Sequence, residues 1–191
     1  MKKIIQILLL SIGLIGFSSS IASSSSSSAN DIDILEPAQI AEMVVASDNN
    51  TNFVGPIISN SKTNEGLDDD LQEYHLSSIK DKSYGFLKHK LNLSITYTSD
   101  SKRNYLSANY CNNLQSCDDQ PEEIINVISA SELGCNGTSC KYKEIMELDV
   151  PDYVLRYITD EGLSVSFNSK KFANIINISF SYITGYLEVA K

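Results

Sequence analysis

Apolar and polar residues alternate at every second position in several stretches of the later part of the chain. The clearest stretch is 87–97, where leucine, isoleucine and tyrosine residues lie in phase and polar residues lie between them. The same alternation recurs in 141–150, 163–167 and 176–180. A period of two is typical of a strand with one buried face. The segment 122–133 fits either a β-branched strand or a short helix.

Helical spacing marks three short segments. Pro37 opens the first, 37–46, and apolar residues then recur three and four positions apart. The second, 151–162, begins at a proline and ends at a glycine, and the third begins at Ser181, which suits a helix N-cap. Together with the strands, these segments predict an α+β fold: a mainly antiparallel sheet or small β-sandwich with short helices at its edges.

The first 22 residues have the pattern of a secretory signal peptide. Lys2 and Lys3 precede an apolar run from Ile4 to Phe17, and Ser20–Ala22 fits a cleavage site of small residues. A membrane anchor is the alternative, but the run is shorter than the roughly 20 apolar residues that span a bilayer. Cleavage after Ala29 is a second option. We therefore expect a periplasmic or secreted protein with no stable membrane insertion after signal cleavage.

Composition divides the remaining chain into two parts. Residues 23–73 are rich in serine, asparagine and acidic residues, which predicts a largely flexible segment around the helix at 37–46. Residues 74–191 carry the strand patterns and form the expected single globular domain. Without Lys2 and Lys3 the formal charge falls from −9 to −11, since 13 of the 15 basic residues then face 24 acidic ones. Such a charge disfavours nucleic acid and anionic membranes as partners.

The four cysteines lie beyond the signal and within one short window, at Cys111, Cys117, Cys135 and Cys140. In an oxidising compartment an even, clustered set favours disulfide bonds. A zinc site is the first alternative, but the spacings are C-x5-C and C-x4-C, and neither His75 nor His89 is close in sequence. A redox centre would need a C-x-x-C motif, which is absent. We expect two disulfides and neither a metal nor another cofactor.

The sequence leaves the connectivity of these disulfides open among three arrangements. Local pairs would close two small loops, whereas crossed pairs would tie separate strands together and close longer loops, which stabilise more. Gly134 and Gly137 permit the turn that a Cys135–Cys140 bond needs, because glycine adopts a positive φ without strain. We favour that local pair.

No motif in the chain specifies a catalytic mechanism. The chain has two histidines, and it lacks the nucleophile elbow, paired metal-binding histidines, phosphate loops and dinucleotide glycine patterns of common enzymes. His89 stands between Lys88 and Lys90 and in phase with the apolar residues, so we expect it at the edge of the buried strand face rather than as a base. These observations argue against an enzyme and name no catalytic residue.

Basic residues are concentrated around the first of the predicted strands. They would pair with the acidic segment 23–73 within the molecule, or meet an acidic partner outside it. Glu144 lies on an apolar strand face, where a buried carboxylate needs Arg103, Arg156 or backbone amides as partners. The candidate binding surface comprises Lys88, Lys90, Lys102, Arg103, Tyr142 and Glu144.

Three stretches carry a resemblance to known proteins: CKYKEIMELDVPDYVL, GLSVSFNS and INISFSYITGYL. They resemble exported proteobacterial proteins and lipoproteins of unknown function. The shared features are a loop bounded by cysteines, an aromatic residue and a glutamate on the next strand, and a last strand that leads into a tyrosine and a short C-terminal helix. The resemblance covers residues 91–187 and implies an envelope location and no activity. The chain departs from the lipoproteins because no cysteine lies near either predicted cleavage site.

These features favour an exported, non-catalytic protein that binds an envelope component such as a polysaccharide, or another protein. The chain has ten tyrosines and no tryptophan, and tyrosines suit such a binding face. One alternative is a secreted hydrolase that uses two facing carboxylates. A second is an inhibitor of an envelope-degrading enzyme, in which the loop Gly134–Cys140 inserts into the cleft of that enzyme.

Overall fold

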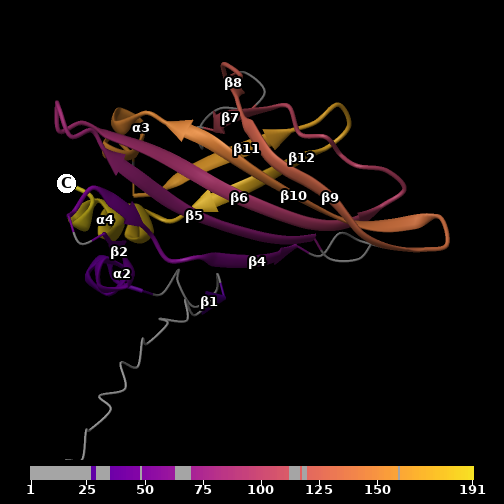
Figure 1. Cartoon of the computed structure of the whole chain (residues 1–191), viewed down its shortest axis with the longest axis horizontal. Helices are drawn as coiled ribbons and strands as arrows, with labels where there is room; N and C mark the ends of the chain where they lie inside the picture. The colour runs from indigo at the N-terminus through magenta and orange to yellow at the C-terminus, as the bar shows by residue number, and fades with distance from the viewer. Residues whose placement is uncertain are drawn as a thin grey trace, which may run out of the picture.

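Two mainly antiparallel sheets face each other across one hydrophobic core, and short helices lie at one end (Figure 1). The expected α+β class, with a mainly antiparallel sheet and short edge helices, is therefore confirmed. The computed structural model describes residues 27–28, 35–47, 49–62, 70–111, 117, 120–158 and 160–191.

The larger sheet contains β1 (Ser27–Ser28), β2 (Val45–Ala46), β3 (Asn52–Val54), β4 (Ile58–Lys62), β5 (Asp70–Lys80), β6 (Leu87–Ser99), β9 (Asn126–Asn136) and β10 (Ser139–Val150). Its main order is β1-β4-β5-β6-β10-β9. Strands β3 and β4 pair with successive parts of the same β5 edge, and β2 pairs with β3. The contact between β1 and β4 is parallel, and the other pairs in this sheet are antiparallel.

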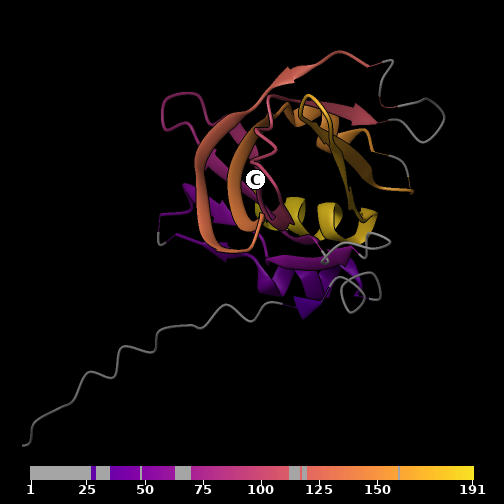
Figure 2. The same cartoon turned by 90° about the vertical axis from the view of Figure 1, so that its right-hand side faces the viewer.

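The smaller sheet has the order β12-β11-β7-β8. Its strands are β7 (Ser107–Cys111), β8 (Glu123–Ile124), β11 (Leu163–Asn168) and β12 (Ala173–Ile178). Only Ile125 separates β8 from β9, so the two sheets are joined directly there. Figure 2 shows how the larger sheet curves around the core toward the smaller one.

Period-two alternation correctly identifies the strands at the centre of the fold. The in-phase residues of β6 turn inward, and Leu91, Leu93 and Ile95 are at most 1% exposed. β10 presents its even-numbered side chains to the same core. The segment 122–133, which fitted either a strand or a short helix, forms β8 and most of β9. Its pairing with β10 favours the strand over the helix.

The helices are α2 (Pro37–Met43), α3 (Asp152–Arg156) and α4 (Phe180–Val189). Helix α4 begins after Ser179, whose side chain accepts a bond from the Tyr182 backbone N–H at 3.2 Å. The predicted cap, Ser181, thus lies two residues too late, because strand β12 ends at Ile178, directly before Ser179. No helix in the described ranges is long and apolar enough to cross a membrane.

The N-terminal boundary of the ordered fold differs from the predicted one at residue 74. Within 23–73, the expected flexible segment, Ile40, Phe53 and Ile58 are at most 2% exposed and belong to the common core. Their sequence neighbours are mostly polar, so the composition of the segment does not reveal that these residues are buried. Phe53 and Ile58 lie on the short strands β3 and β4, which pair with β5. The predicted signal peptide, 1–22, lies outside the described residues.

Candidate functional site

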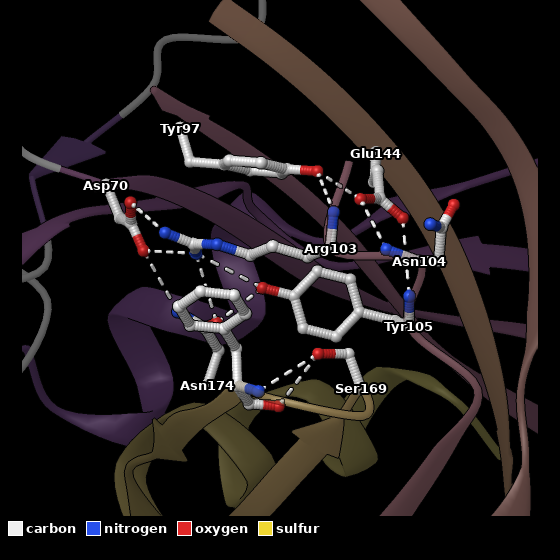
Figure 3. Close-up of polar contacts among 9 residues, drawn as sticks. Asp70, Tyr97, Arg103, Asn104, Tyr105, Glu144, Ser169 and Asn174 are labelled. Atoms are coloured by element: carbon white, nitrogen blue, oxygen red, sulfur yellow. Dashed lines mark hydrogen bonds and ion pairs between the residues drawn. The ribbon is translucent and has the colours of Figure 1, made fainter. Parts of the chain in front are cut away.

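A polar cluster surrounds the Arg103 guanidinium group between the two sheets (Figure 3). Arg103 lies between β6 and β7, and its side chain is 5% exposed. It makes two parallel bonds to Asp70, at 2.5 Å from Nη1 to Oδ2 and 3.0 Å from Nη2 to Oδ1. Its Nη1 lies 3.3 Å from both the Tyr105 hydroxyl and Asn174 Oδ1. We call the following residues the Arg103 cluster: Asp70, Tyr97, Arg103, Tyr105, Glu144 and Asn174.

Glu144 brings a second buried carboxylate to this cluster. It accepts hydrogen bonds from the Tyr97 hydroxyl and from the backbone N–H groups of Asn104, at 3.2 Å, and Tyr105, at 3.4 Å. Backbone amides are therefore among its partners, as the sequence allowed, while Arg103 bonds Asp70 instead. Burial raises the pKa of the Tyr97 hydroxyl and raises that of Tyr105 to about 12, so both remain protonated donors at neutral pH.

The Arg103 cluster connects the two sheets. Asp70 opens β5 and Glu144 lies on β10 of the larger sheet, whereas Asn174 lies on β12 of the smaller one. The guanidinium also stacks on the Tyr97 ring, with its Cζ 4.1 Å from the ring centroid. Since both charged side chains of the central pair are at most 5% exposed, a dissolved substrate does not reach them. The cluster is therefore a structural link rather than a catalytic centre.

The six residues of the predicted binding surface do not form one surface. Arg103, Tyr142 and Glu144 are at most 9% exposed, because Tyr142 and Glu144 face the core from β10 and the Arg103 side chain bonds the buried Asp70. Lys90 pairs with Glu147 at 2.6 Å. The remaining two residues also lie apart, since Lys88 is exposed near the start of β6 and Lys102 lies between β6 and β7.

A second buried polar chain lies near the opposite end of β5 and β6. His89 Nδ1 lies 2.5 Å from the Ser78 hydroxyl oxygen, and His89 Nε2 lies 3.0 Å from Asp152 Oδ1. Ser78 also bonds the Tyr186 hydroxyl, and Arg156 Nε bonds Asp152 at 2.7 Å. The bonds to Arg156 and to His89 lower the pKa of the Asp152 carboxyl. The two ring nitrogens of His89 therefore contact Ser78 on one side and Asp152 on the other.

Serine, histidine and aspartate in contact are the groups of an acyl-transfer triad, so their exposure decides their role. Ser78 is 2% exposed, and the His89 side chain is completely buried. The serine hydroxyl is also held from two sides, by His89 and by Tyr186 of α4. These bonds link α4, and through His89 and Asp152 also α3, to the larger sheet. Ser78, His89 and Asp152 also line a pocket of about 510 Å³ at this end of the sheet.

The β9–β10 hairpin extends beyond the other strands at one end of the molecule (Figure 1). Cys135 and Cys140 face each other across its end and form a disulfide, while Cys111 bonds Cys117. Both pairs are local, and the predicted Cys135–Cys140 bond is confirmed. Gly137, with a φ of +65°, makes the turn between the paired cysteines. The disulfide therefore fixes the tip of a hairpin whose β9 strand is largely exposed on both faces.

Two bulges interrupt the pairing of β9 with β10. The register shifts leave Leu133 and Ile128 without a directly opposed partner on β10. Their side chains are 55% and 53% exposed. The Lys102 ammonium group donates to the Ala130 carbonyl at 2.9 Å, between the two bulges. Bulges on an edge strand oppose the addition of another strand, and the Lys102 ammonium group occupies one carbonyl of β9.

The hairpin tip also brings together the potential metal ligands Glu132, Cys135 and Cys140, with ligand atoms within 4.8 Å of one another. Both sulfur atoms are already bonded to each other. Zinc binds cysteine as the thiolate, so this set is not a metal site while the disulfide is intact.

Comparisons of the chain with protein-family models, with curated proteins and with solved structures find no match.

Proposed function

We propose that this protein is an exported, non-catalytic binding protein that contacts another protein through the β9–β10 hairpin. The carrying observation is the pair of half-exposed apolar side chains, Ile128 and Leu133, at the bulges of a hairpin that a disulfide holds. Bulges re-aim side chains, and rigid apolar groups lose little entropy when a partner covers them.

The hairpin suits side-chain contact better than strand addition. Its backbone edge is interrupted twice and capped by Lys102 at Ala130, so a long added strand would find few regular partners. A shallow hollow of about 350 Å³ near the tip is lined by Leu133 and by the stem of Lys141, among others. A protruding side chain of the partner would fit there. The inhibitor alternative uses this same hairpin and differs only in the identity of the partner.

Export is supported by the two disulfides, because such bonds persist in oxidising compartments. The resemblance to exported envelope proteins and the signal-like first 22 residues point in the same direction.

Intact mass spectrometry of protein recovered from its native cells tests export and the disulfides together. We expect a chain that begins at Ser23 or Asn30 and is four hydrogens lighter than its fully reduced form, since each of the two disulfides removes two hydrogens. Reduction and alkylation should then label all four cysteines. A full-length chain, or four free thiols in the native sample, would contradict the proposal.

Site-specific photo-crosslinking in the native cells tests the role of the hairpin. A photoreactive phenylalanine analogue at Leu133 should give one discrete adduct with a second protein. The same analogue at Leu106, which is as exposed but lies outside the hairpin, should not give it. A second variant carries the photoreactive analogue at Ile128 together with the substitution Leu133→Lys. Its adduct should be at least about tenfold weaker than that of the protein with the analogue at Ile128 alone, because the contact would have to desolvate the lysine charge.

The matched substitution Leu106→Lys should leave the Ile128 adduct unchanged. Equal adducts from positions 133 and 106, or no adduct from the hairpin in folded, exported protein, would rule out the hairpin as the contact surface.

A further inference from the structure

A pocket of about 510 Å³ opens at the end of the larger sheet where β5, β6 and β10 meet the start of α3. This volume lies within the about 300–1,000 Å³ that is typical of small-ligand sites. Its apolar walls include Ile79, Leu87 and Pro151. The pocket lies beside the start of α3, at the opposite end of the molecule from the β9–β10 hairpin tip (Figure 1).

Charged groups of both signs line this pocket. Its lining includes Lys88, Glu123 and Asp149, together with Lys90, which pairs with Glu147, and Asp152, which bonds His89 and Arg156. A ligand with a net charge of either sign would meet repulsion from one set. A ligand rich in hydroxyl groups uses both sets, because a hydroxyl group donates to a carboxylate and accepts from an ammonium group.

The turn that leads into the pocket wall presents two exposed aromatic rings. Tyr84 and Phe86 are 78% and 72% exposed, and they stack with ring centroids 6.4 Å apart and planes inclined by 22°. Phe86 directly precedes Leu87 and Lys88, which line the pocket. Neither ring contributes to the core, so folding alone does not account for two large aromatic side chains there.

This aromatic turn is held in place before any ligand arrives. The Asp81 carboxylate accepts hydrogen bonds from the backbone N–H groups of Ser83, at 2.8 Å, and Tyr84, at 3.0 Å. The Asp81 backbone N–H donates to the Phe86 carbonyl at 2.8 Å, and Gly85 takes a φ of +73° that closes the turn. An ordered turn that displays rings at low entropic cost is a feature of binding surfaces.

We infer that this pocket and the adjoining Tyr84–Phe86 pair form a binding site for a neutral oligosaccharide. The flat ring faces would contact the apolar C–H faces of sugar rings, and the mixed charges of the pocket would bond the sugar hydroxyl groups. The acidic surface of the protein, with a formal charge of −9 for the full chain, disfavours anionic polysaccharides.

Ligand-observed NMR titration of the folded, oxidised protein tests this assignment. The probes are neutral pentasaccharides of glucose, mannose, xylose and N-acetylglucosamine, with an acidic pentagalacturonate and an unrelated basic pentapeptide as competing ligand classes. We expect saturable binding of at least one neutral probe with a Kd at or below about 1 mM. The double substitution Tyr84→Ala/Phe86→Ala should weaken this binding at least tenfold.

Two further variants separate a binding role from a structural one. Asp81→Ala frees the turn but keeps both rings, so it should weaken binding by a smaller factor than the loss of the rings. Leu106→Ala removes a similarly exposed apolar side chain elsewhere and should change nothing. All variants are first checked for an unchanged unfolding temperature. No binding of any neutral probe, binding of only the acidic probe or the peptide, or sugar binding that survives Tyr84→Ala/Phe86→Ala would overturn the inference.

Discussion

Arg103→Met is expected to lower the free energy of unfolding by about 3–5 kcal/mol, the cost of leaving a buried carboxylate without its cation. Asp70 is 2% exposed, and its two carboxylate oxygens each accept a hydrogen bond from the Arg103 guanidinium group. A methionine fills much of the same volume but donates no hydrogen bond. Because small domains are stable by only about 5–15 kcal/mol, this one change removes a large share of the total. Urea unfolding followed by circular dichroism measures it.

A surface ion pair provides the matched control for this prediction. Lys143 lies 3.8 Å from Glu73, and both side chains are about one-third exposed. Lys143→Met should therefore change the free energy of unfolding by less than about 1 kcal/mol, as exposed pairs usually do.

The double substitution Arg103→Met/Asp70→Leu should recover most of the lost stability, since it removes both charges of the Arg103–Asp70 pair from the interior. Arg103→Met could lower the free energy of unfolding no more than Lys143→Met does, or the added Asp70→Leu could lower it further. Either result would show that the ion pair is not the main contribution of the Arg103 cluster to stability.

Local periodicity explains why the central strands are predictable. In β6 and β10 each inward position can be recognised from its two neighbours, because a strand repeats every two residues. The Cys135–Cys140 bond is predictable for a similar reason, since Gly137 makes a turn between cysteines that are close in sequence. These features depend on short segments only.

The remaining features depend on residues that are distant in sequence. Strands β3 and β4 are short and polar, and their pairing with β5 cannot be derived from either segment alone. Asp70 and Arg103 are 33 positions apart, and no motif connects them. One signal was present: Asp70 and Ser78 are in phase with buried Tyr74 and Leu76 on β5. A polar residue in phase with apolar ones indicates a buried partner.

The predicted binding surface does not form in the structure, because its six residues face different parts of the fold. The alternation along 141–150 already placed Tyr142 and Glu144 on the apolar face of β10, and the structure buries both, so they cannot belong to a binding surface with Lys88 and Lys102. Conversely, Ile128 and Leu133 are exposed like most of β9, and they lie at bulges in the β9–β10 register that leave no trace in the periodicity of either strand.

Gly185→Ala is expected to destabilise the protein by about 1–3 kcal/mol, although alanine is the better helix former. Gly185 lies on the buried face of α4, where this helix crosses α2. A Cβ atom there would lie 2.2 Å from the Pro37 carbonyl oxygen and 2.6 Å from Ile40 Cβ. Real Cβ atoms do not approach other atoms so closely, so α2 would have to move away from α4.

Helix α2 has little freedom to make that move. Glu36 and Gln39 form a capping box at its start, and Ile40 is completely buried in the common core. The strain therefore falls on the packing between the two helices rather than on a mobile side chain. Thermal unfolding should show a lower midpoint for Gly185→Ala. Hydrogen exchange should show faster opening of residues 37–43, because the clash weakens the docking of α2 specifically.

The sign of the change distinguishes this explanation from simple helix propensity. At an exposed position a change from glycine to alanine stabilises a helix by about 1 kcal/mol, so a more stable Gly185→Ala would show that α2 does not approach α4 closely. Glu188→Ala, at an exposed position of the same helix, should stay within about 0.5 kcal/mol of the parent protein. A loss with Gly185→Ala but not with Glu188→Ala would place α2, and with it part of the segment predicted to be flexible, inside the cooperatively folded domain.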